Sequence, residues 1–482
     1  MAASVHTAEK FNVKLCILLP LVVAVSMILW LVPVDFYGID GLTVVEKRTI
    51  AIFVFTALMW MFEIIPTWTT SVLSIVIMPL TISDSSIWFM KGSGIPAEMG
   101  TFVSYKALLA TFADPVIMLF LGGFVLAIAT TKVGLDVQLA RALLKPFGKK
   151  SEFVLLGFLM VIGIFSMFMS NTATAAMMLT FLAPVLRMLP PDGKGRIGLA
   201  MSIPIAANLG GIGTPIGTPP NAIALGYIND SLHLGVGFGE WMLVMVPYVL
   251  VMLLISWGLL LFFFPFKQKT IELRIENTHP KTWRTYVVYV TFAVTILLWM
   301  LDRVTGINSN VVAMIPVGVF AVTGVLTKED LKEINWSVLW MVAGGFALGI
   351  ALQSTGLAEH LVNSIPFGQW LPLVVILVSG FIGYFISNFI SNTAAANLLV
   401  PIMSAVGVGM GDSLLEVGGI KTLLVGVALS TSLAMLFPIS TPPNALAHST
   451  GLVTTKDMAK VGILIGVIGF VLGYAMLIFI GI

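Results

Sequence analysis

Two copies of one short polar element, Ser-x-x-x-Ser-Asn-Thr, interrupt long apolar runs at residues 166–172 and 387–393. Each copy has two serines four residues apart, which would lie one above the other on a helix face. Hydroxyls, an amide C=O and free backbone carbonyls suit a hard cation, whereas NH₂ groups and helix N-termini suit an anion. The element therefore predicts a site where a sodium ion and a carboxylate bind side by side.

A second motif, Thr-Pro-Pro-Asn-Ala, follows each copy at residues 218–222 and 441–445. Proline lacks an N–H and clashes with the preceding turn, so we expect each motif to break a helix. Gly217, just before the first break, adopts conformations that other residues avoid. Backbone carbonyls near Gly217 and Ser440 are then free to bind a cation. The threonine of each motif opens a half-helix whose positive end can receive a carboxylate.

The two halves of the chain repeat each other in register. The Ser-Asn-Thr elements are 221 residues apart, the proline motifs 223, and the pair Gly122-Gly123-Phe124 and Gly344-Gly345-Phe346 222. Isolated polar residues in membrane helices are more often structural, bonding the local backbone or a neighbouring helix. Paired interruptions in two membrane halves instead point to a transporter's binding site. For the Gly-Gly-Phe pair we expect close helix packing rather than ligand contact.

The composition predicts a polytopic membrane protein. Hydrophobic residues make up 58% of the chain and charged residues 10%, and mean hydropathy is +1.03. Such values lie outside the soluble range. Eleven apolar runs have membrane-spanning length. They cover residues 13–34, 49–64, 66–83, 112–131, 197–228, 241–266, 285–301, 309–326, 336–353, 420–450 and 460–481.

Two further runs, 153–189 and 371–409, are too long for one ordinary helix. In the first, the Ser-Asn-Thr element separates apolar arms of 16 and 17 residues. As helices these arms measure about 24–26 Å, short of a hydrocarbon core of about 30 Å. Basic residues flank both ends of this run. We therefore predict two re-entrant helical hairpins with the Ser-Asn-Thr elements at their tips.

The positions of Lys and Arg set the expected orientation. With the N-terminus in the cytoplasm and the C-terminus outside, all but six of the 25 Lys and Arg residues fall inside, as positively charged inner loops require. Each repeat then has five crossings and one hairpin, so the second copy is inverted. The first run could also be a signal peptide, but it is long and no clear cleavage site follows. We expect a helix outside the repeat. The single cysteine, Cys16, excludes a disulfide within the chain.

The predicted fold is an all-α polytopic membrane protein with about 11 transmembrane helices, two re-entrant hairpins and an inverted-topology repeat. The extra N-terminal helix covers 13–34. The first repeat covers 49–266, with its hairpin at 153–189 and a broken helix at 197–228. The second covers 285–481, with its hairpin at 371–409 and a broken helix at 420–450.

The absence of certain residue types from the predicted membrane core also limits the functions that the chain can have. No Lys or Arg lies there in this topology, so bound cations and helix dipoles must neutralise an anion. The motifs carry no carboxylate pair, metal cluster or nucleophile with its base, which argues against an enzyme. Glu63 and Asp114 lie at segment ends, where a capping or interfacial role and a functional role are equally expected. His448 is expected to pack within the core. Neither an organic cofactor nor a nucleic-acid partner is indicated.

These motifs resemble the divalent anion/sodium symporters, which carry C4 dicarboxylates, citrate or sulfate. The resemblance covers nearly the whole chain. It implies an elevator-type homodimer in which residues 153–266 and 371–481 form the transport unit and the rest the scaffold. It assigns sodium site 1 to Ser166, Ser170, Asn171 and Gly217, and sodium site 2 to Ser387, Ser391, Asn392 and Ser440. It assigns the substrate shell to Asn171, Thr172, Thr218, Pro219, Asn392, Thr393, Thr441 and Pro442.

The resemblance further implies sodium-coupled import of dianions such as succinate, fumarate and malate across a bacterial inner (plasma) membrane. Its partners would be the dicarboxylate, sodium ions, membrane lipid and a second copy of the chain. A sodium-independent exchanger and a sulfate or citrate transporter remain alternatives. An anion channel would need a continuous polar or charged lining, which these runs lack.

Overall fold

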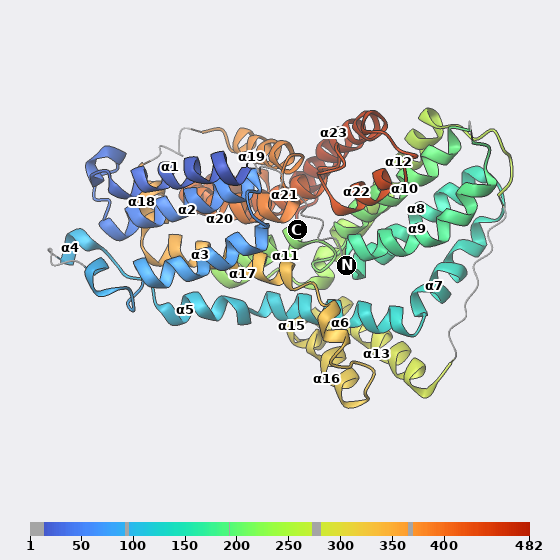
Figure 1. The fold of residues 1–482 in the computed structure, drawn as a ribbon, viewed down its shortest axis with the longest axis horizontal. Helices are drawn as coiled ribbons and strands as arrows, with labels where there is room; N and C mark the ends of the chain where they lie inside the picture. The colour runs from blue at the N-terminus through green and yellow to red at the C-terminus, as the bar shows by residue number, and fades with distance from the viewer. Residues whose placement is uncertain (1–13, 92–95, 192, 272–280, 365–369) are drawn as a thin grey trace, which may run out of the picture.

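The computed structural model describes residues 14–91, 96–191, 193–271, 281–364 and 370–482, and this part of the chain is helical (Figure 1). It contains two isolated β-bridges and no strand. Seven of its helical segments are long and apolar enough to cross a membrane, and six further apolar helices have 10–17 residues. The all-helical prediction is confirmed at this level.

The first half of the chain forms a series of helices joined by short connections. Helix α1 (Leu19–Leu31) stands before the repeat. The first repeat then contains α2 (Val44–Phe62), α3 (Thr67–Ile82), α5 (Tyr105–Ala110), α6 (Pro115–Lys132), α7 (Leu135–Leu144), α8 (Ser151–Phe168), α9 (Asn171–Met188), α10 (Gly195–Gly211), α11 (Pro219–Gly226) and α12 (Phe238–Phe263).

The second repeat contains the matching series. Its members are α13 (Trp283–Met300), α15 (Ser309–Val312), α16 (Met314–Val322), α17 (Trp336–Ser354), α18 (Leu357–Ser364), α19 (Pro372–Ser387), α20 (Asn392–Met410), α21 (Gly419–Ser432), α22 (Pro442–Ser449) and α23 (Thr455–Phe479). Both proline motifs follow a break in the helix, since seven residues separate α10 from α11 and nine separate α21 from α22.

The arms of the first predicted hairpin, α8 and α9, are longer than expected. Each has 18 residues rather than 16 or 17, because Ser151 and Glu152 extend the first arm at its start. This corresponds to about 27 Å of helix. About two-thirds of α8 is buried within the protein, mainly against α10, α12 and α7. The arm is therefore covered by protein rather than exposed along its length.

The two repeats interlock through their short half-helices. Helix α11 of the first repeat packs against α20 and α21 of the second, and α22 of the second packs against α9 and α10 of the first. Figure 1 shows α11 beside α21 and α22 beside α10. Four helix N-termini, those of α9, α11, α20 and α22, thereby gather near the middle of the molecule, where residues from all four line one cavity.

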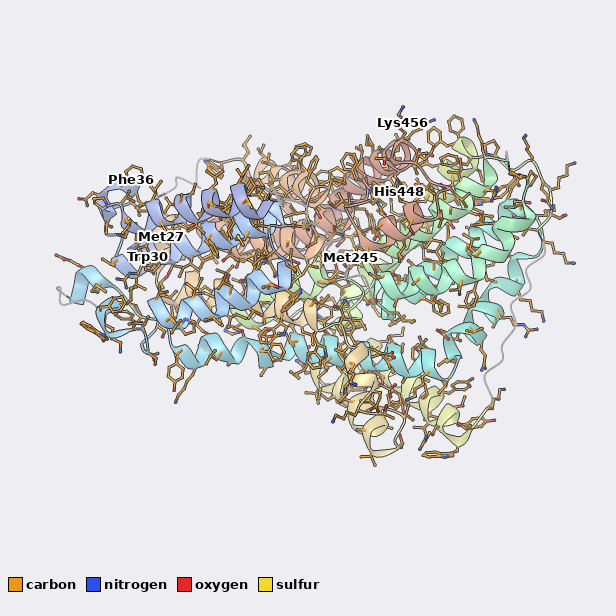
Figure 2. All side chains as sticks on the ribbon, viewed as in Figure 1. Met27, Trp30, Phe36, Met245, His448 and Lys456 are labelled. Atoms are coloured by element: carbon orange, nitrogen blue, oxygen red, sulfur yellow. The ribbon has the colours of Figure 1, made fainter. Side chains whose placement is uncertain are left out.

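The paired glycines allow close helix contact, as predicted. A Cβ on Gly122 would overlap the backbone carbonyl of Ala313, and a Cβ on Gly344 would lie 2.5 Å from the Cβ of Ser71. Small residues at such points let helix backbones approach each other. Asp114 caps α6 by accepting a hydrogen bond of 2.8 Å from the Val116 N–H, so capping is the role that the geometry shows. His448 is exposed near the end of α22 (Figure 2). The prediction that it packs in the core was therefore wrong. The short helix ends one residue later, at Ser449.

Candidate ion and substrate site

Three of the four predicted residues of sodium site 1, Ser166, Asn171 and Gly217, meet at the end of α8. Ser166 Oγ lies 2.6 Å from Asn171 Oδ1 and 2.7 Å from the carbonyl oxygen of Ala207. The same terminal atom of the Asn171 amide lies 3.1 Å from the Gly217 carbonyl and 3.2 Å from that of Ala207. This atom faces only acceptors, so either an NH₂ group stands there or an amide oxygen joins them around a cation. With the amide oxygen in this position, the atoms are of the type that binds a hard cation.

The second repeat reproduces this geometry around the predicted sodium site 2. Ser387 Oγ lies 2.8 Å from Asn392 Oδ1 and 2.8 Å from the carbonyl oxygen of Thr431. Ser387 is fully buried. The carbonyls of Ala207 and Thr431 occupy matching positions, near the ends of α10 and α21, and sequence reasoning missed both. A backbone carbonyl leaves no trace in residue type, so only the repeat itself could have suggested them.

The expectation that each serine pair shares a helix face was wrong. Helix α8 ends at Phe168 and Met169 is extended, so Ser170 belongs to the next helix as its N-cap. Ser170 Oγ accepts a hydrogen bond from the Ala173 N–H at 3.2 Å, and Ser391 Oγ accepts one from Ala394 at the same distance. An N-cap satisfies an N–H that the helix leaves unpaired. The second serine of each element thus fixes the start of the second arm.

The asparagines of the proline motifs hold the unwound segments in place. Asn221 Nδ2 donates to the carbonyls of Gly211, Ile212 and Thr214 at 2.8–3.2 Å. Asn444 Nδ2 donates to those of Met435 and Phe437, both at 2.9 Å. Broken helices leave carbonyls that need donors when buried. The motifs therefore use Asn221 and Asn444 as structural ties, a role that the sequence did not reveal.

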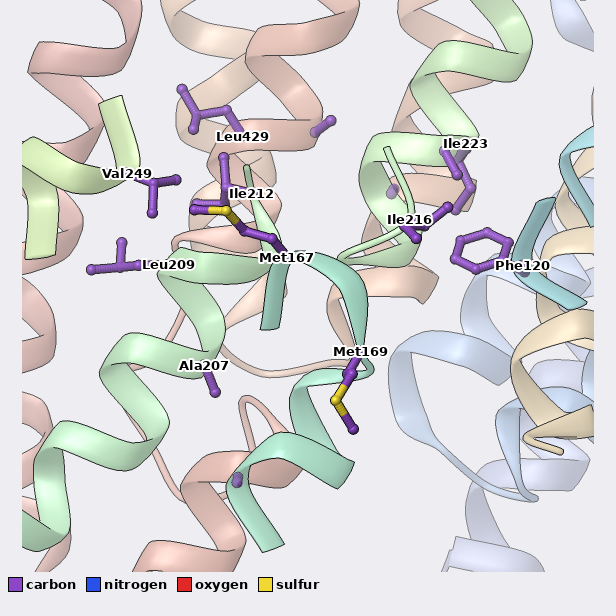
Figure 3. Close-up of a cluster of buried hydrophobic side chains, with 14 of the residues drawn as sticks. Phe120, Met167, Met169, Ala207, Leu209, Ile212, Ile216, Ile223, Val249 and Leu429 are labelled. Carbon is purple, nitrogen blue, oxygen red and sulfur yellow. The ribbon is translucent and has the colours of Figure 1, made fainter. Parts of the chain in front are cut away.

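Hydroxyl groups attach each unwound segment to its neighbouring hairpin. Ser440 Oγ donates to the carbonyl of Asn388 at 2.9 Å, and the hydroxyl of Thr214 donates to the carbonyl of Met167. Ser440 is buried, as a residue near a cation site must be. Met167 near the end of α8 and Ile212 and Ile216 in the break between α10 and α11 belong to one buried apolar cluster (Figure 3).

All eight predicted substrate residues line one cavity of about 210 Å³. They approach it from the starts of α9, α11, α20 and α22, whose N-termini each carry a partial positive charge. Thr172 is exposed and Thr393 is buried, so the two repeats contribute unequally. Residues that the sequence did not single out complete the wall: Thr67, Phe120, Asn208, Ile216, Asn335, Val338, Met341 and Pro443, together with Phe124 of the first Gly-Gly-Phe.

Comparisons with known proteins identify the family of the chain. Residues 13–481 match the family model described as the sodium:sulfate symporter transmembrane region. The chain belongs to this family. It is therefore a membrane transport protein. It is 33% identical over 388 residues to an uncharacterized transporter of Haemophilus influenzae, covering 76% of this chain and 81% of that one.

Two further similarities extend the comparison. The chain is 27% identical over 468 residues to the sodium-dependent dicarboxylate transporter SdcS of Staphylococcus saprophyticus, covering 90% of this chain and 85% of SdcS. A solved structure of MtrF from Neisseria gonorrhoeae has a TM-score of 0.52 at 12% identity, covering 85% of this chain and 94% of that one. The MtrF match concerns the fold alone.

Proposed function

We propose that this symporter-family protein imports C4 dicarboxylates, such as succinate, fumarate and malate, together with sodium ions. The observation that carries the proposal is the duplicated oxygen cluster. Ser166 with Asn171 and Ser387 with Asn392 each meet a backbone carbonyl, and both asparagines also line the central cavity. One asparagine can therefore contact a sodium ion on one side and a carboxylate on the other. The SdcS relative, by its name, transports dicarboxylates in a sodium-dependent manner.

The lining of the cavity favours a small dianion. None of the described residues that line it is Lys or Arg. Hydroxyls, amides and four helix N-termini are the donors available, and two bound sodium ions would supply the remaining positive charge. An anion without co-bound sodium would meet too little positive charge in this cavity. We therefore expect transport of the anion to be coupled to sodium.

We further propose an elevator motion in which residues 153–266 and 371–481 move against the remaining scaffold within a homodimer. The central cavity meets Thr67 at the start of α3 and Asn335 just before α17. In the predicted topology, with the N-terminus inside and the C-terminus outside, both points lie at the inner ends of scaffold helices. The arrangement therefore corresponds to an inward position of the transport unit.

Uptake of labelled succinate into proteoliposomes tests this function. Sodium medium should support uptake into empty vesicles and choline medium should not. Uptake in choline that requires internal dicarboxylate would identify a sodium-independent exchanger instead. Excess unlabelled fumarate or malate should compete. If sulfate or citrate competes and these C4 acids do not, the substrate assignment is wrong while sodium coupling stands.

A further inference from the structure

A second cavity, of about 440 Å³, lies apart from the central one. Its walls come from the π-helix Tyr227–Ser231 that follows α11, from Leu232, and from α17, α18 and α20. By volume it is about twice the central cavity. The proposed transport unit supplies the π-helix and α20, and the proposed scaffold supplies α17. An occupant would touch both units.

The deep end of this cavity carries an unused hydroxyl. Tyr227 is 3% exposed, and its hydroxyl has no hydrogen-bond partner among the described residues. Buried hydroxyl groups are normally paired, because leaving one unpaired costs about 1–3 kcal/mol. A Cβ on Gly349 would overlap this hydroxyl, so the glycine gives it room. The tyrosine is thus held against α17, and its unpaired hydroxyl is enclosed beside Gly349, which lines the same cavity.

The remaining lining sets the chemistry of a ligand. Leu232, Leu352 and Val408 give apolar contact, and the exposed Glu359 places a carboxylate at the opening. Among the described lining residues there is no Lys or Arg, and Glu359 adds a carboxylate, which the lining of the central cavity does not have. Apolar walls with a few placed polar groups are typical of small-molecule sites. An anionic lipid headgroup would be repelled by Glu359.

We propose that this cavity is a regulatory site for a small amphipathic amine. The ammonium group pairs with Glu359, the apolar body fills the space between α17 and α20, and a polar group at the far end meets the Tyr227 hydroxyl. Because the occupant bridges the two units, it slows their relative movement and inhibits transport without competing with substrate. The effect on transport rests on the proposed function, whereas binding does not.

Binding is tested on the purified full-length protein by its thermal unfolding midpoint with three probes. We expect 4-(4-aminobutyl)phenol to raise the midpoint in a concentration-dependent way. We expect 4-phenylbutylamine to bind about two- to tenfold more weakly, since it lacks the hydroxyl. The anionic 4-(4-hydroxyphenyl)butanoate should have the weakest effect. Equal shifts with all three probes would indicate a purely apolar site, such as one for an acyl chain, and overturn the proposal.

Variants locate the binding site. Tyr227→Phe should bring the affinity of the phenol down to that of 4-phenylbutylamine without lowering the stability of the free protein, because the lost hydroxyl has no partner. Glu359→Gln should weaken both amines up to about fivefold, as for an exposed ion pair. Val408→Trp, at an exposed position, should block the cavity. Glu416→Gln, an exposed carboxylate elsewhere, is the control. Binding that none of the three variants changes contradicts this site.

Transport then tests regulation separately. In proteoliposomes that show sodium-driven succinate uptake, the phenol should lower the maximal rate and leave the KM for succinate unchanged. A raised KM with an unchanged maximal rate would mean competition at the central cavity and refute the regulatory role. If vesicles without the probe fail to take up succinate, the proposed function fails, and the midpoint shifts still decide whether the site exists.

Discussion

The four asparagines of the paired motifs have two different roles. Asn171 and Asn392 place one end of their amides among hydroxyl and carbonyl oxygens beside the cavity. Asn221 and Asn444 direct their NH₂ groups to the carbonyls of unwound backbone. Asn171 and Asn392 are therefore positioned to bind a ligand, whereas Asn221 and Asn444 hold the unwound backbone in place. Substitution of each pair should therefore fail in a different way.

Removing a binding amide should abolish transport and spare the fold. We expect Asn171→Ala and Asn392→Ala each to eliminate sodium-driven succinate uptake, because a cation ligand and a substrate contact are lost together. Expression and the thermal unfolding midpoint should change little. Asn310→Ala, a partly exposed asparagine distant in sequence, is the control. Normal uptake in either test variant would contradict the two sodium sites.

Removing a supporting amide should destabilise the protein. Asn221→Ala leaves three buried carbonyls without their donor, and Asn444→Ala leaves two. Each buried polar group left unpaired costs about 1–3 kcal/mol. The unfolding midpoint should fall clearly in both variants, further than in Asn171→Ala. Midpoints equal to those of the wild-type protein would show that the hydrogen bonds of Asn221 and Asn444 do not stabilise the unwound segments.

At this scale the sequence predicted which residues meet, but not every role. The eight substrate residues were assigned from the family resemblance that the repeated motifs carry, and the structure places them on one cavity. Ser170 and Ser391 were misread because a spacing of four residues implies one face only within an unbroken helix. The carbonyls of Ala207 and Thr431 could not be predicted, since any residue type supplies one.

Among the elements, one charge pair joins the end of α6 to the segment before α17. Lys132 Nζ lies 2.6 Å from Asp330 Oδ2, which also accepts hydrogen bonds from the N–H and hydroxyl of Thr327. Burial acts to raise the pKa of Asp330, but the hydrogen bonds from Lys132 and Thr327 outweigh it and hold that pKa below its ordinary value. The pair therefore stabilises the folded protein at neutral pH.

The pH dependence of this link follows from the sign of the shift. A carboxyl group whose pKa is lowered by folding adds stability above its ordinary pKa and loses that stability as the pH falls through the lowered value. Asp330→Asn should lower the unfolding midpoint at pH 7, with a cost of about 1–2 kcal/mol. The difference from the wild-type protein should shrink on acidification into that range. A difference that stays constant would mean that the charge on Asp330 contributes nothing.

Helix boundaries were predictable where proline and polar residues interrupt apolar runs. Both breaks occur at the expected motifs, and the order of elements follows the repeat. What the sequence could not show is how α11 and α22 cross to pack on the other repeat. That arrangement depends on contacts between residues more than 200 positions apart, and periodicity along one segment carries no information about them.

For the whole molecule, the proposed motion predicts a change in access to the hairpin tips. In a Cys16→Ala background, Ala173→Cys should react with an impermeant thiol reagent applied from the cytoplasmic side, because Ala173 is exposed. Ala394→Cys, fully buried, should react slowly. Adding sodium and succinate should change the rate at Ala173. Rates that never respond to either ligand would argue against alternating access through these elements.

The net charge of the transported complex gives the last prediction. Helix N-termini each contribute about half a positive charge, and together with bound sodium they can balance two carboxylates. A protonated acid presents one fewer negative group to the same donors. Uptake at fixed total succinate should therefore fall as external pH drops through the second ionisation of the diacid.

Raising total succinate until the dianion concentration is restored separates substrate protonation from damage to the protein. Uptake should then recover, because the described residues lining the cavity include no carboxylate or basic side chain that could take up a proton. A matched series with labelled sulfate, which stays dianionic over the same range, controls for pH effects on the carrier if sulfate is transported. Uptake that climbs on acidification and ignores sodium would mean proton coupling, and the two proposed cation sites would then be wrong.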